Sequence, residues 1–441
     1  MINSYLLIIS LKGCVVMQED RIKLTSFFNR REKYGIKPGL DRIHKLLELI
    51  NNPEKEIKAV HIAGTNGKGS TIQFMKRALI ESGYNVGVFT SPSFNGLVGH
   101  IENNDTFIDE RTFLNILQEI MPAIESLDSE NNHPTSFEII TAVAFQYFKN
   151  HVDIVLVEAG MGGLEDTTNC FTPILSIITN IDYDHIGFLG ETLEEIARHK
   201  AGIIKHSVPV VTGEKKTIPN VIIRQKAEEM KAELIETEKE VSIKVLEQNK
   251  ELTTFDWSFR HVDQRITHHL LGAYQTDNCS LALTALVMLQ DSLDLDWVKI
   301  KKAIKNVQIQ GRFEEVLKEP SIIIDGAHNM AGVESFVNSV QLLNERKERK
   351  LLLAMFKDKD VEGALSRLEE VFQKMVVTTF DHERAAEADE LLKMLTNAQA
   401  EKSRSWKQSI DELIENDEQA YITGSLHFIT RVRDYILTNY K

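Results

Sequence analysis

The fold of this chain is decided by residues 60–71, which read VHIAGTNGKGST. The apolar run Ile57–Ala63 predicts a buried strand, and from Thr71 to Ser82 apolar residues recur at the spacing of one helical face. A strand, a glycine-rich loop with a lysine and a helix are together typical of a phosphate-binding loop. Glycines let backbone N–H groups approach an anion, the helix start adds free N–H groups, and Lys68 adds a positive charge.

The loop differs by one residue from the common form GxxxxGK[ST], because Gly69 separates Lys68 from Ser70. An ordinary strand-to-helix turn is the alternative, but such a turn does not require a lysine and a serine among three glycines. We therefore expect phosphate groups to bind at a short run of loop residues: Gly64, Thr65, Asn66, Gly67, Lys68, Gly69 and Ser70.

Composition limits the classes of partner. At 441 residues the chain is too long for one compact core, so two domains are expected. The net charge of -14 argues against nucleic acid or an anionic membrane as a partner, although a local positive site can still hold an anionic ligand. The three cysteines, Cys14, Cys170 and Cys279, are widely spaced, which suits a reducing compartment and argues against a disulfide framework.

The N-terminus carries a short apolar run, Tyr5–Leu11. No positive charge precedes it and no small-residue cleavage site follows it, so a signal peptide is not expected, and the run is too short to span a bilayer. Met17 is an alternative start, which would make residues 1–16 an extension without structural consequence. These features predict a cytoplasmic protein that does not cross a membrane.

Strands and helices alternate after the loop, which predicts an α/β fold with a doubly wound, mostly parallel sheet. The expected strands are Asn85–Phe89, Val152–Val157, Ile174–Thr179 and Val208–Val211; the expected helices are Glu110–Leu127, one that opens at the capping box Thr135–Glu138, and one after Thr192 that carries Lys200. Leu234–Leu271 has short alternating segments and predicts an antiparallel appendage, before helices at Ala273–Gln290 and Trp297–Asn306.

A second α/β run follows, and it predicts a smaller Rossmann-like domain. Its expected strands are Ser321–Ile324, Lys350–Met355, Met375–Thr379 and Ala420–Thr423. We place the boundary near Gln308–Arg312, so that the first domain covers residues 1–310 and the second covers residues 311–441.

Polar residues follow three of the predicted strands, namely Glu158, His185 and Asp325. Ligands of open α/β sheets bind at the carboxyl ends of the strands, so three such residues indicate a site. Glu158 offers a hard oxygen ligand for Mg²⁺, and a neutral His185 can bind a metal through one ring nitrogen. An ordinary loop histidine is the alternative for His185.

Several sequence blocks together resemble folylpolyglutamate synthase and dihydrofolate synthase, of the Mur-ligase superfamily. The most specific blocks are TNGKGS at residues 65–70 and DGAHN at residues 325–329. Corroborating blocks occur in the family's order: residues 89–92, 134–138, 162–163 with 166–169, 178–180 with 184–185 and 189–190, 200–205, 311–314, 358–360 and 423–426.

The resemblance implies an ATP-dependent ligase with Mg²⁺. The carboxylate of a folate or of dihydropteroate would attack the γ-phosphate of ATP and form an acyl phosphate. The amino group of L-glutamate would then attack the acyl phosphate, form an amide and release phosphate. Partners would be these small molecules only, and a monomer is the default expectation.

The resemblance also assigns roles to individual residues. Lys68, Lys200 and His328 would be catalytic, with Lys200 matching a lysine that is carbamylated in the superfamily, although the sequence alone indicates a helix-surface lysine there. The remaining matches are Ser91, Glu158 and His185 for Mg²⁺; Asn278, Arg312 and Asp325 for the nucleotide; and Asp166, His328 and Ser425 for the substrates.

The sequence departs from the family pattern at a few loop positions. Leu164 stands where the family has an arginine, and Gly99–Ile101, Tyr274 and His199 also differ. Two alternatives therefore stay open: a Mur-type ligase for another acid, and a paralogue that binds nucleotide without ligation. Retention of Glu158 and His185 favours a ligase, because a module that only binds nucleotide needs no metal site.

Overall fold

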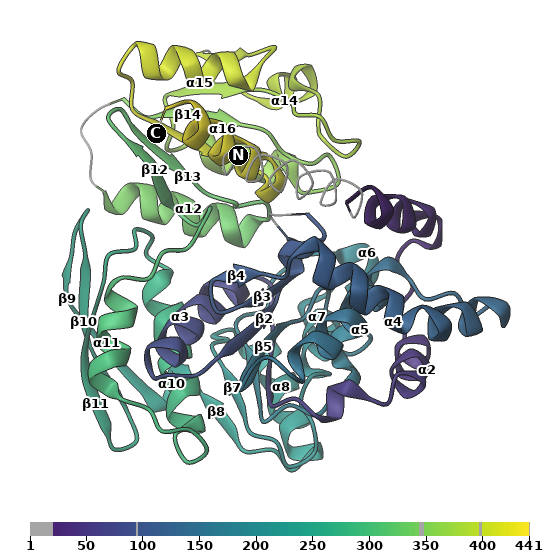
Figure 1. The fold of residues 1–441 in the computed structure, drawn as a ribbon. Coiled ribbons are helices and arrows are strands. Elements are labelled where there is room, and N and C mark those ends of the chain that lie inside the picture. Colours follow the sequence, from purple (N-terminus) through teal and green to yellow (C-terminus); the bar gives the residue numbers. More distant parts are fainter. Residues whose placement is uncertain (1–20, 94–95, 344–347, 397–398, 441) are drawn as a thin grey trace, which may run out of the picture.

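The computed structural model describes residues 21–93, 96–343, 348–396 and 399–440. The apolar run Tyr5–Leu11, Met17 and the expected extension 1–16 lie outside the described residues. The chain forms a larger lobe, coloured purple to green in Figure 1, and a smaller lobe, coloured green to yellow, which lies against one end of the larger lobe.

The larger lobe is built on an eight-stranded sheet with the order β4-β3-β2-β5-β1-β6-β7-β8. Strands β1, β2, β5, β6, β7 and β8 are parallel, and β3 and β4 form an antiparallel edge. This arrangement confirms the predicted doubly wound sheet. The strands are β1 Ala59–Ala63, β2 Val86–Phe89, β3 Ile101–Asn103, β4 Thr106–Phe107, β5 Ile154–Glu158, β6 Leu175–Ile178, β7 Val210–Thr212 and β8 Leu234–Glu236.

Both faces of this sheet are buried, which is why its strands are continuous apolar runs. Val60 and Ile62 of β1 pack with α3, α10 and α11 on one face, whereas Ala59 and Ala63 lie on the other face, with α2, α4, α5, α7 and α8. A helix over residues 21–31 joins the second group. The helices are α2 Asp41–Leu49, α3 Lys68–Glu81, α4 Glu110–Ser129, α5 Ser136–Phe148, α6 Ile186–Leu189, α7 Leu193–Ala201, α8 Thr217–Glu229, α9 Thr237–Glu240, α10 Gln275–Leu289 and α11 Trp297–Lys305.

The expected antiparallel appendage is only partly correct. Leu234–Glu236 is β8, and it pairs in parallel with β7 as the last strand of the main sheet. The appendage begins later, at Val241, and forms a separate sheet of β9 Val241–Gln248, β10 Thr253–Phe259 and β11 Val262–His268, at the outer side of the lobe in Figure 1. A three-residue strand carries too little periodicity to reveal its partner, so the sequence misplaced the boundary.

The smaller lobe holds a six-stranded sheet with the order β12-β13-β17-β14-β15-β16. Only β12 is antiparallel, and helices α12 and α13 cover one face while α15 and α16 cover the other. Its elements are β12 Glu314–Lys318, β13 Ser321–Ile324, α12 Met330–Leu342, β14 Lys350–Leu353, α13 Val361–Glu369, β15 Lys374–Val377, α14 Ala388–Met394, β16 Ala400–Lys402, α15 Trp406–Glu415, β17 Ala420–Thr423 and α16 Leu426–Asn439.

The proposed boundary between residues 310 and 311 stays a prediction. It falls between α11, the last helix that packs on the first sheet, and β12, the first strand of the second sheet. None of the helices in the part of the chain that the structure describes is long and apolar enough to cross a bilayer.

Helix α7 begins with the predicted capping box. The Glu195 N–H donates to Thr192 Oγ1 at 3.2 Å, and the Thr192 N–H donates to Glu195 Oε2 at 3.1 Å. Two N–H groups that the helix start would leave unpaired are thereby satisfied.

We predict that Thr192→Ala lowers the free energy of unfolding of the larger lobe by about 1 kcal/mol, because the cap acceptor is lost. Chemical denaturation followed by circular dichroism measures this change. Thr192→Ser keeps the acceptor and serves as the matched control. Equal midpoints for the alanine and serine variants would contradict the assigned cap.

Candidate active site

Two glycines shape the phosphate loop between β1 and α3. Gly64 has φ 151° and Gly67 has φ 86°, a backbone conformation that favours glycine. A Cβ on Gly64 would lie 1.8 Å from Thr179 Oγ1, and one on Gly67 would lie 2.5 Å from Asn278 Oδ1. The loop can therefore pass between β6 and α10 only because these positions lack side chains.

The loop is fastened to the segment that follows β6. The N–H groups of Thr65 and Asn66 donate to Asn180, at 2.9 Å to its carbonyl and 2.8 Å to its Oδ1. Thr179 Oγ1 donates to the Asn66 carbonyl at 2.6 Å. Because these two N–H groups are already used, an anion would meet the first N–H groups of α3, Lys68–Ser70, which have no partner within the helix.

Lys68 lies between the loop and the end of β5. Its Nζ donates to the Gly64 and Thr65 carbonyls at 3.0 and 3.3 Å, and lies 3.8 Å from Glu158 Oε1. Burial raises the pKa of the Glu158 carboxyl, while Lys68, Arg312 and the Ser91 N–H oppose that rise. The structure thus brings the predicted residues Lys68, Glu158 and Ser91 together.

His185 stands beside the same group of charges, in a left-handed conformation with φ 50° at the start of α6. Burial lowers the pKa of His185 to about 4; Asp184 opposes that shift, and Lys359, Lys68 and Lys200 reinforce it. The ring is therefore neutral near pH 7, and a ring nitrogen is free of a proton.

Lys200 is buried, which corrects the helix-surface position that the sequence alone indicated. Its side chain follows the buried face of α7, one turn after Ile196, and the residue is 3% exposed. Burial, with Lys68 acting in the same direction, lowers the pKa of Lys200 to about 7, while Asp184 and Asp166 oppose the shift. Spacing on the helix could have shown this, since Lys200 is four residues after Ile196.

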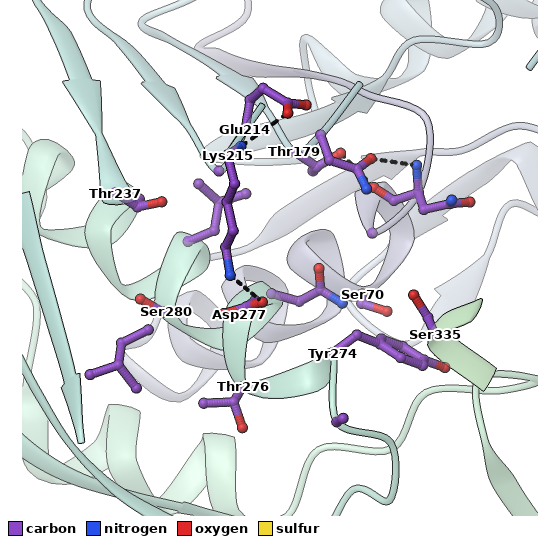
Figure 2. Close-up of a pocket in the computed structure, with 18 of the residues that line it drawn as sticks. Ser70, Thr179, Glu214, Lys215, Thr237, Tyr274, Thr276, Asp277, Ser280 and Ser335 are labelled. Carbon is purple, nitrogen blue, oxygen red and sulfur yellow. Dashed lines mark hydrogen bonds and ion pairs between the residues drawn. The ribbon is translucent and has the colours of Figure 1, made fainter. Parts of the chain in front are cut away.

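A cavity of about 660 Å³ opens beside the phosphate loop and takes its walls from both lobes. The larger lobe contributes Asn66, Gly67, Ser70 and Asn278, and the smaller lobe contributes Arg312 and Asp325. Figure 2 shows Ser70, Tyr274 and Ser335 among the side chains that line it, and an ion pair between Lys215 and Asp277 in its wall. Six of the residues expected to contact the nucleotide therefore border one space, whereas Gly64, Thr65, Lys68 and Gly69 do not line it.

Asp325 is buried at the end of β13 and is held by three donors. The N–H groups of Phe313 and Ala327 and the hydroxyl of Tyr274 each donate to it at 2.8 Å. Burial raises the pKa of Asp325, and the nearby Arg312 opposes that rise. Tyr274, one of the departures noted in the sequence, is thus a direct partner of a predicted site residue.

The sequence missed a network across the two lobes, centred on Asp184. Lys359 Nζ lies 2.6 Å from Asp184 Oδ1, and His328 Nε2 lies 3.6 Å from Oδ2. Burial opposes ionisation, yet His328, His185 and Lys359 hold the pKa of Asp184 well below its usual range. Both Asp184 and Lys359 stood in the quoted sequence blocks, but no local pattern indicated that residues 175 positions apart would meet.

Asn329 extends this network to the phosphate loop. Its side-chain amide exchanges hydrogen bonds with that of Asn66, at 3.1 and 3.3 Å, and it also donates to Asp184 at 3.4 Å. Asn329 is at the same time the N-cap of α12, where its Oδ1 accepts from the Gly332 N–H. The position of the second lobe is thereby linked directly to the loop that carries Lys68.

Asp166 and Ser425, two of the residues predicted to contact substrate, both lie at helix N-caps. Asp166 caps a short 3₁₀ helix, Thr167–Cys170, and accepts from the N–H groups of Met161 and Thr168 at 2.7 and 3.0 Å. Ser425 is fully buried at the N-cap of α16, and its Oγ has no hydrogen-bond partner among the described residues. Their contacts with substrate stay predictions.

The comparisons with known proteins match this architecture. The family model for the Mur ligase middle domain matches residues 62–286, and the one for the Mur ligase glutamate ligase domain matches residues 311–425. The dihydrofolate synthase/folylpolyglutamate synthase of Bacillus subtilis is 34% identical over 92% of this chain and 97% of its own length. The chain belongs to the folylpolyglutamate synthase/dihydrofolate synthase family of Mur ligases.

Solved structures of this family have the same fold over almost the whole chain. The folylpolyglutamate synthase of Thermotoga maritima superposes with a TM-score of 0.82 and 31% identity, covering 95% of this chain and 97% of its own. Escherichia coli FolC in complex with DHPP and ADP gives a TM-score of 0.84 and 27% identity, covering 95% and 98%. The two-lobed arrangement is therefore that of the family.

We predict that Gly67→Ala weakens ADP binding by at least about tenfold, because the added methyl must displace Asn278 from the cavity wall. Isothermal titration with ADP measures the affinity. Gly187→Ala is the matched control, since its methyl would meet no atom within 4 Å. Unchanged ADP affinity in Gly67→Ala would show that this close approach does not shape the site.

Proposed function

We propose that this chain is an ATP-dependent ligase that joins L-glutamate to a folate, to dihydropteroate, or to both, through an acyl phosphate. One observation carries the proposal. Lys68 and Glu158 of the larger lobe lie beside a cavity of nucleotide size, and Arg312 and Asp325 of the smaller lobe line that cavity. The curated relatives with which the chain shares its family are named as dihydrofolate and folylpolyglutamate synthases.

The chemical difficulty of this reaction is the approach of a carboxylate to a polyanionic triphosphate. Lys68 Nζ now contacts two loop carbonyls, and it would exchange these contacts for the outer phosphates when ATP binds. The first N–H groups of α3 add fixed positive ends. Charge neutralisation by groups that are already in position stabilises the transferred phosphoryl group.

Ser91, Glu158 and His185 would hold Mg²⁺. The described residues contain no cluster of three His, Cys, Asp or Glu side chains arranged for a metal, but this set needs only one carboxylate, one hydroxyl and one neutral imidazole. Such a set fits Mg²⁺, which binds through few protein groups together with phosphate oxygens and water. The ion, when bound, neutralises negative charge on the phosphates.

Lys200 would carry a carbamate. A lysine with a pKa of about 7 is half neutral at pH 7, and only the neutral amine adds to CO₂, with release of one proton. The product is an anion in place of a cation beside Lys68, which would hold that lysine and the metal ligands in position.

His328 and Ser425 of the smaller lobe would bind glutamate. His328 donates its Nδ1–H to the Gly326 carbonyl at 2.8 Å, which fixes the ring with Nε2 toward Asp184. The unpartnered, buried Oγ of Ser425 is a donor at the edge of the same sheet. The lobes in contact through Asn66 and Asn329 would exclude water from the acyl phosphate.

We also propose that the protein acts as a monomer in the cytoplasm. The free, buried thiols of Cys170 and Cys279 fit a reducing compartment, and both lobes of one chain line the cavity.

The assay that tests the function supplies ATP, L-glutamate and either dihydropteroate or tetrahydrofolate, and follows phosphate release. We predict release that depends on both the pteridine and glutamate. Release with a muramyl acid but with neither pteridine would instead indicate a Mur-type ligase for another acid. No release with any acid would indicate a nucleotide-binding paralogue.

We predict that Lys68→Ala and Glu158→Gln each lower kcat by at least about a hundredfold in this assay, because Lys68 balances the charge of the triphosphate and Glu158 would hold the Mg²⁺ that does the same. Lys302→Ala, which removes an exposed lysine of α11, is the control and should keep wild-type turnover. Near-normal kcat in either site variant would refute the role given to that residue.

We predict that removal of CO₂ lowers turnover and that added bicarbonate restores it, with the restored activity rising between pH 6 and pH 8 as Lys200 loses its proton. Stopped assays in CO₂-depleted buffer measure this response. Lys200→Arg keeps a cation that cannot be carbamylated, so it should be insensitive to bicarbonate. Full activity of the wild-type protein without CO₂ would contradict the carbamate.

A further inference from the structure

Glu214 is a buried carboxylate that the reaction proposed above does not use. It lies two residues after β7, it is 1% exposed, and it stands in none of the sequence blocks that resemble the family. Figure 2 shows Glu214 and Lys215 among the side chains that line the cavity beside the phosphate loop. Burial of a carboxylate is costly unless its oxygens accept hydrogen bonds. The donors around Glu214 therefore indicate its role.

Three backbone N–H groups donate to this carboxylate. Those of Lys215 and Lys216 donate to Oε1, at 3.0 and 2.6 Å, and that of Ile181 donates to Oε2. The first two belong to the turn in which Glu214 itself lies, whereas Ile181 follows β6, the strand that pairs with β7. Both oxygens must accept, and an amide of the same shape has only one oxygen and a donor NH₂ group. An acid is therefore the side chain that fits here.

The Ile181 N–H belongs to the same peptide group that holds the phosphate loop. The carbonyl of this peptide is that of Asn180, which accepts from the Thr65 N–H at 2.9 Å. In a trans peptide the N–H and the C=O point in opposite directions, so Glu214 on one side directs the carbonyl toward Thr65 on the other. Hydrogen bonds that follow one another in such a chain polarise and strengthen each other. Glu214 thus acts on the loop through a single peptide group.

Further hydrogen bonds join the same three segments of the chain. Lys216 Nζ donates to the Ile181 carbonyl at 2.8 Å and to Asp182 Oδ2 at 2.6 Å. The Asp182 N–H donates to Thr65 Oγ1 at 2.9 Å, and the Thr65 hydroxyl donates to the Asp182 carbonyl at 3.0 Å. The turn after β7 therefore fastens the segment after β6, and that segment fastens the phosphate loop. His185 follows the middle segment, three residues after Asp182.

We propose that Glu214 is a positioning residue for ATP binding, which fixes the peptide between Asn180 and Ile181 and, through that peptide, the phosphate loop. The inference rests on the proposed function, since it explains how the loop is held ready for the triphosphate of ATP. Both oxygens of Glu214 accept from backbone N–H groups, so Glu214 acts through the loop and not on the nucleotide. A backbone that is fixed in advance needs no rearrangement when the first N–H groups of α3 meet the phosphates.

Glutamine at this position separates the positioning role from the shape of the side chain. Its one oxygen can accept from Ile181 or from the turn after β7, and its NH₂ group then faces an N–H donor on the other side. The peptide between Asn180 and Ile181 is then free to turn its carbonyl away from Thr65. The phosphate loop loses one of its attachments, and nucleotide affinity falls. The smaller lobe is not affected, so binding of the amino acid there should not change.

The test compares Glu214→Gln with Glu236→Gln, both in the full chain. Glu236 is the matched control, because it is also a buried carboxylate, 8% exposed, at the end of β8, the strand that pairs with β7. Its ion-pair partners are Arg224 and Lys239, which lie away from the phosphate loop in sequence and do not line the cavity. Isothermal titration with Mg²⁺ present gives the ADP affinity. The phosphate-release assay gives KM for ATP and for L-glutamate.

We expect Glu214→Gln to weaken ADP binding and to raise KM for ATP, each by at least about tenfold, with KM for L-glutamate within about twofold. Glu236→Gln should keep all three values within about twofold, even where it lowers the thermal unfolding midpoint. Unchanged ADP affinity in Glu214→Gln, or an equal loss in both variants, overturns the positioning role. Absent phosphate release with every acid, together with the expected loss of ADP affinity, overturns the proposed function alone.

Amide hydrogen exchange tests the same role without substrate. In the wild-type protein free of nucleotide, the N–H groups of Thr65 and Ile181 should exchange slowly, because both are hydrogen-bonded in the described chain. In Glu214→Gln both should exchange at least about tenfold faster, whereas Glu236→Gln should leave them unchanged. Fast exchange of these two groups in the wild-type protein overturns the role even if Glu214→Gln does not fold. Unchanged exchange in a folded Glu214→Gln overturns it as well.

Discussion

The position of Lys68 is the constraint on which the rest of the structure depends. Its ammonium group is held by two carbonyls of its own loop and lies close to Glu158, so a positive charge is fixed at the carboxyl end of the central strand. The loop can hold it there because Gly64 and Gly67 allow the chain to pass Thr179 and Asn278 without a clash. A methyl group in place of a hydrogen on either glycine would move the loop and, with it, the Lys68 ammonium group.

The second lobe is placed by reference to the same loop. Asn329 binds Asn66, while Lys359 and His328 approach Asp184. Ion pairs between buried groups add little net stability, since desolvation opposes their attraction, but a broken pair is costly. Their contribution here is geometric: they join the lobes in a position in which the ends of both parallel sheets border a common space.

In both sheets the candidate site residues lie where parallel strands end, which is where open α/β sheets bind ligands. In the first sheet that edge carries the charges that would meet a triphosphate. In the second it carries Asp325 near the nucleotide cavity, then Ser425 and then Lys359. The order of the strands thus sets the order of these side chains along the edge of the sheet.

Much of the fold could be predicted because its determinants are local. Runs such as residues 154–157 are apolar throughout because both faces of the sheet are covered, and capping boxes at Thr135 and Thr192 fixed two helix starts. The β8 strand was misplaced because three residues carry no periodicity that identifies a partner. The burial of Lys200 could be predicted from its spacing to Ile196 on one face of α7. The meeting of Asp184 with Lys359 depends on tertiary packing, which a single sequence does not encode in any short window.

The most direct test of the account is the fate of the carboxylate oxygen during turnover. When the attacking carboxylate of the pteridine substrate is labelled with ¹⁸O, an acyl phosphate must pass one labelled oxygen to the phosphate that is released, because the amine displaces phosphate at the carbonyl carbon. We predict one ¹⁸O in each inorganic phosphate formed, detected by mass spectrometry or by the isotope shift in ³¹P spectra. Phosphate free of label, formed at the same rate as the amide product, would contradict activation of the acid by ATP at this site.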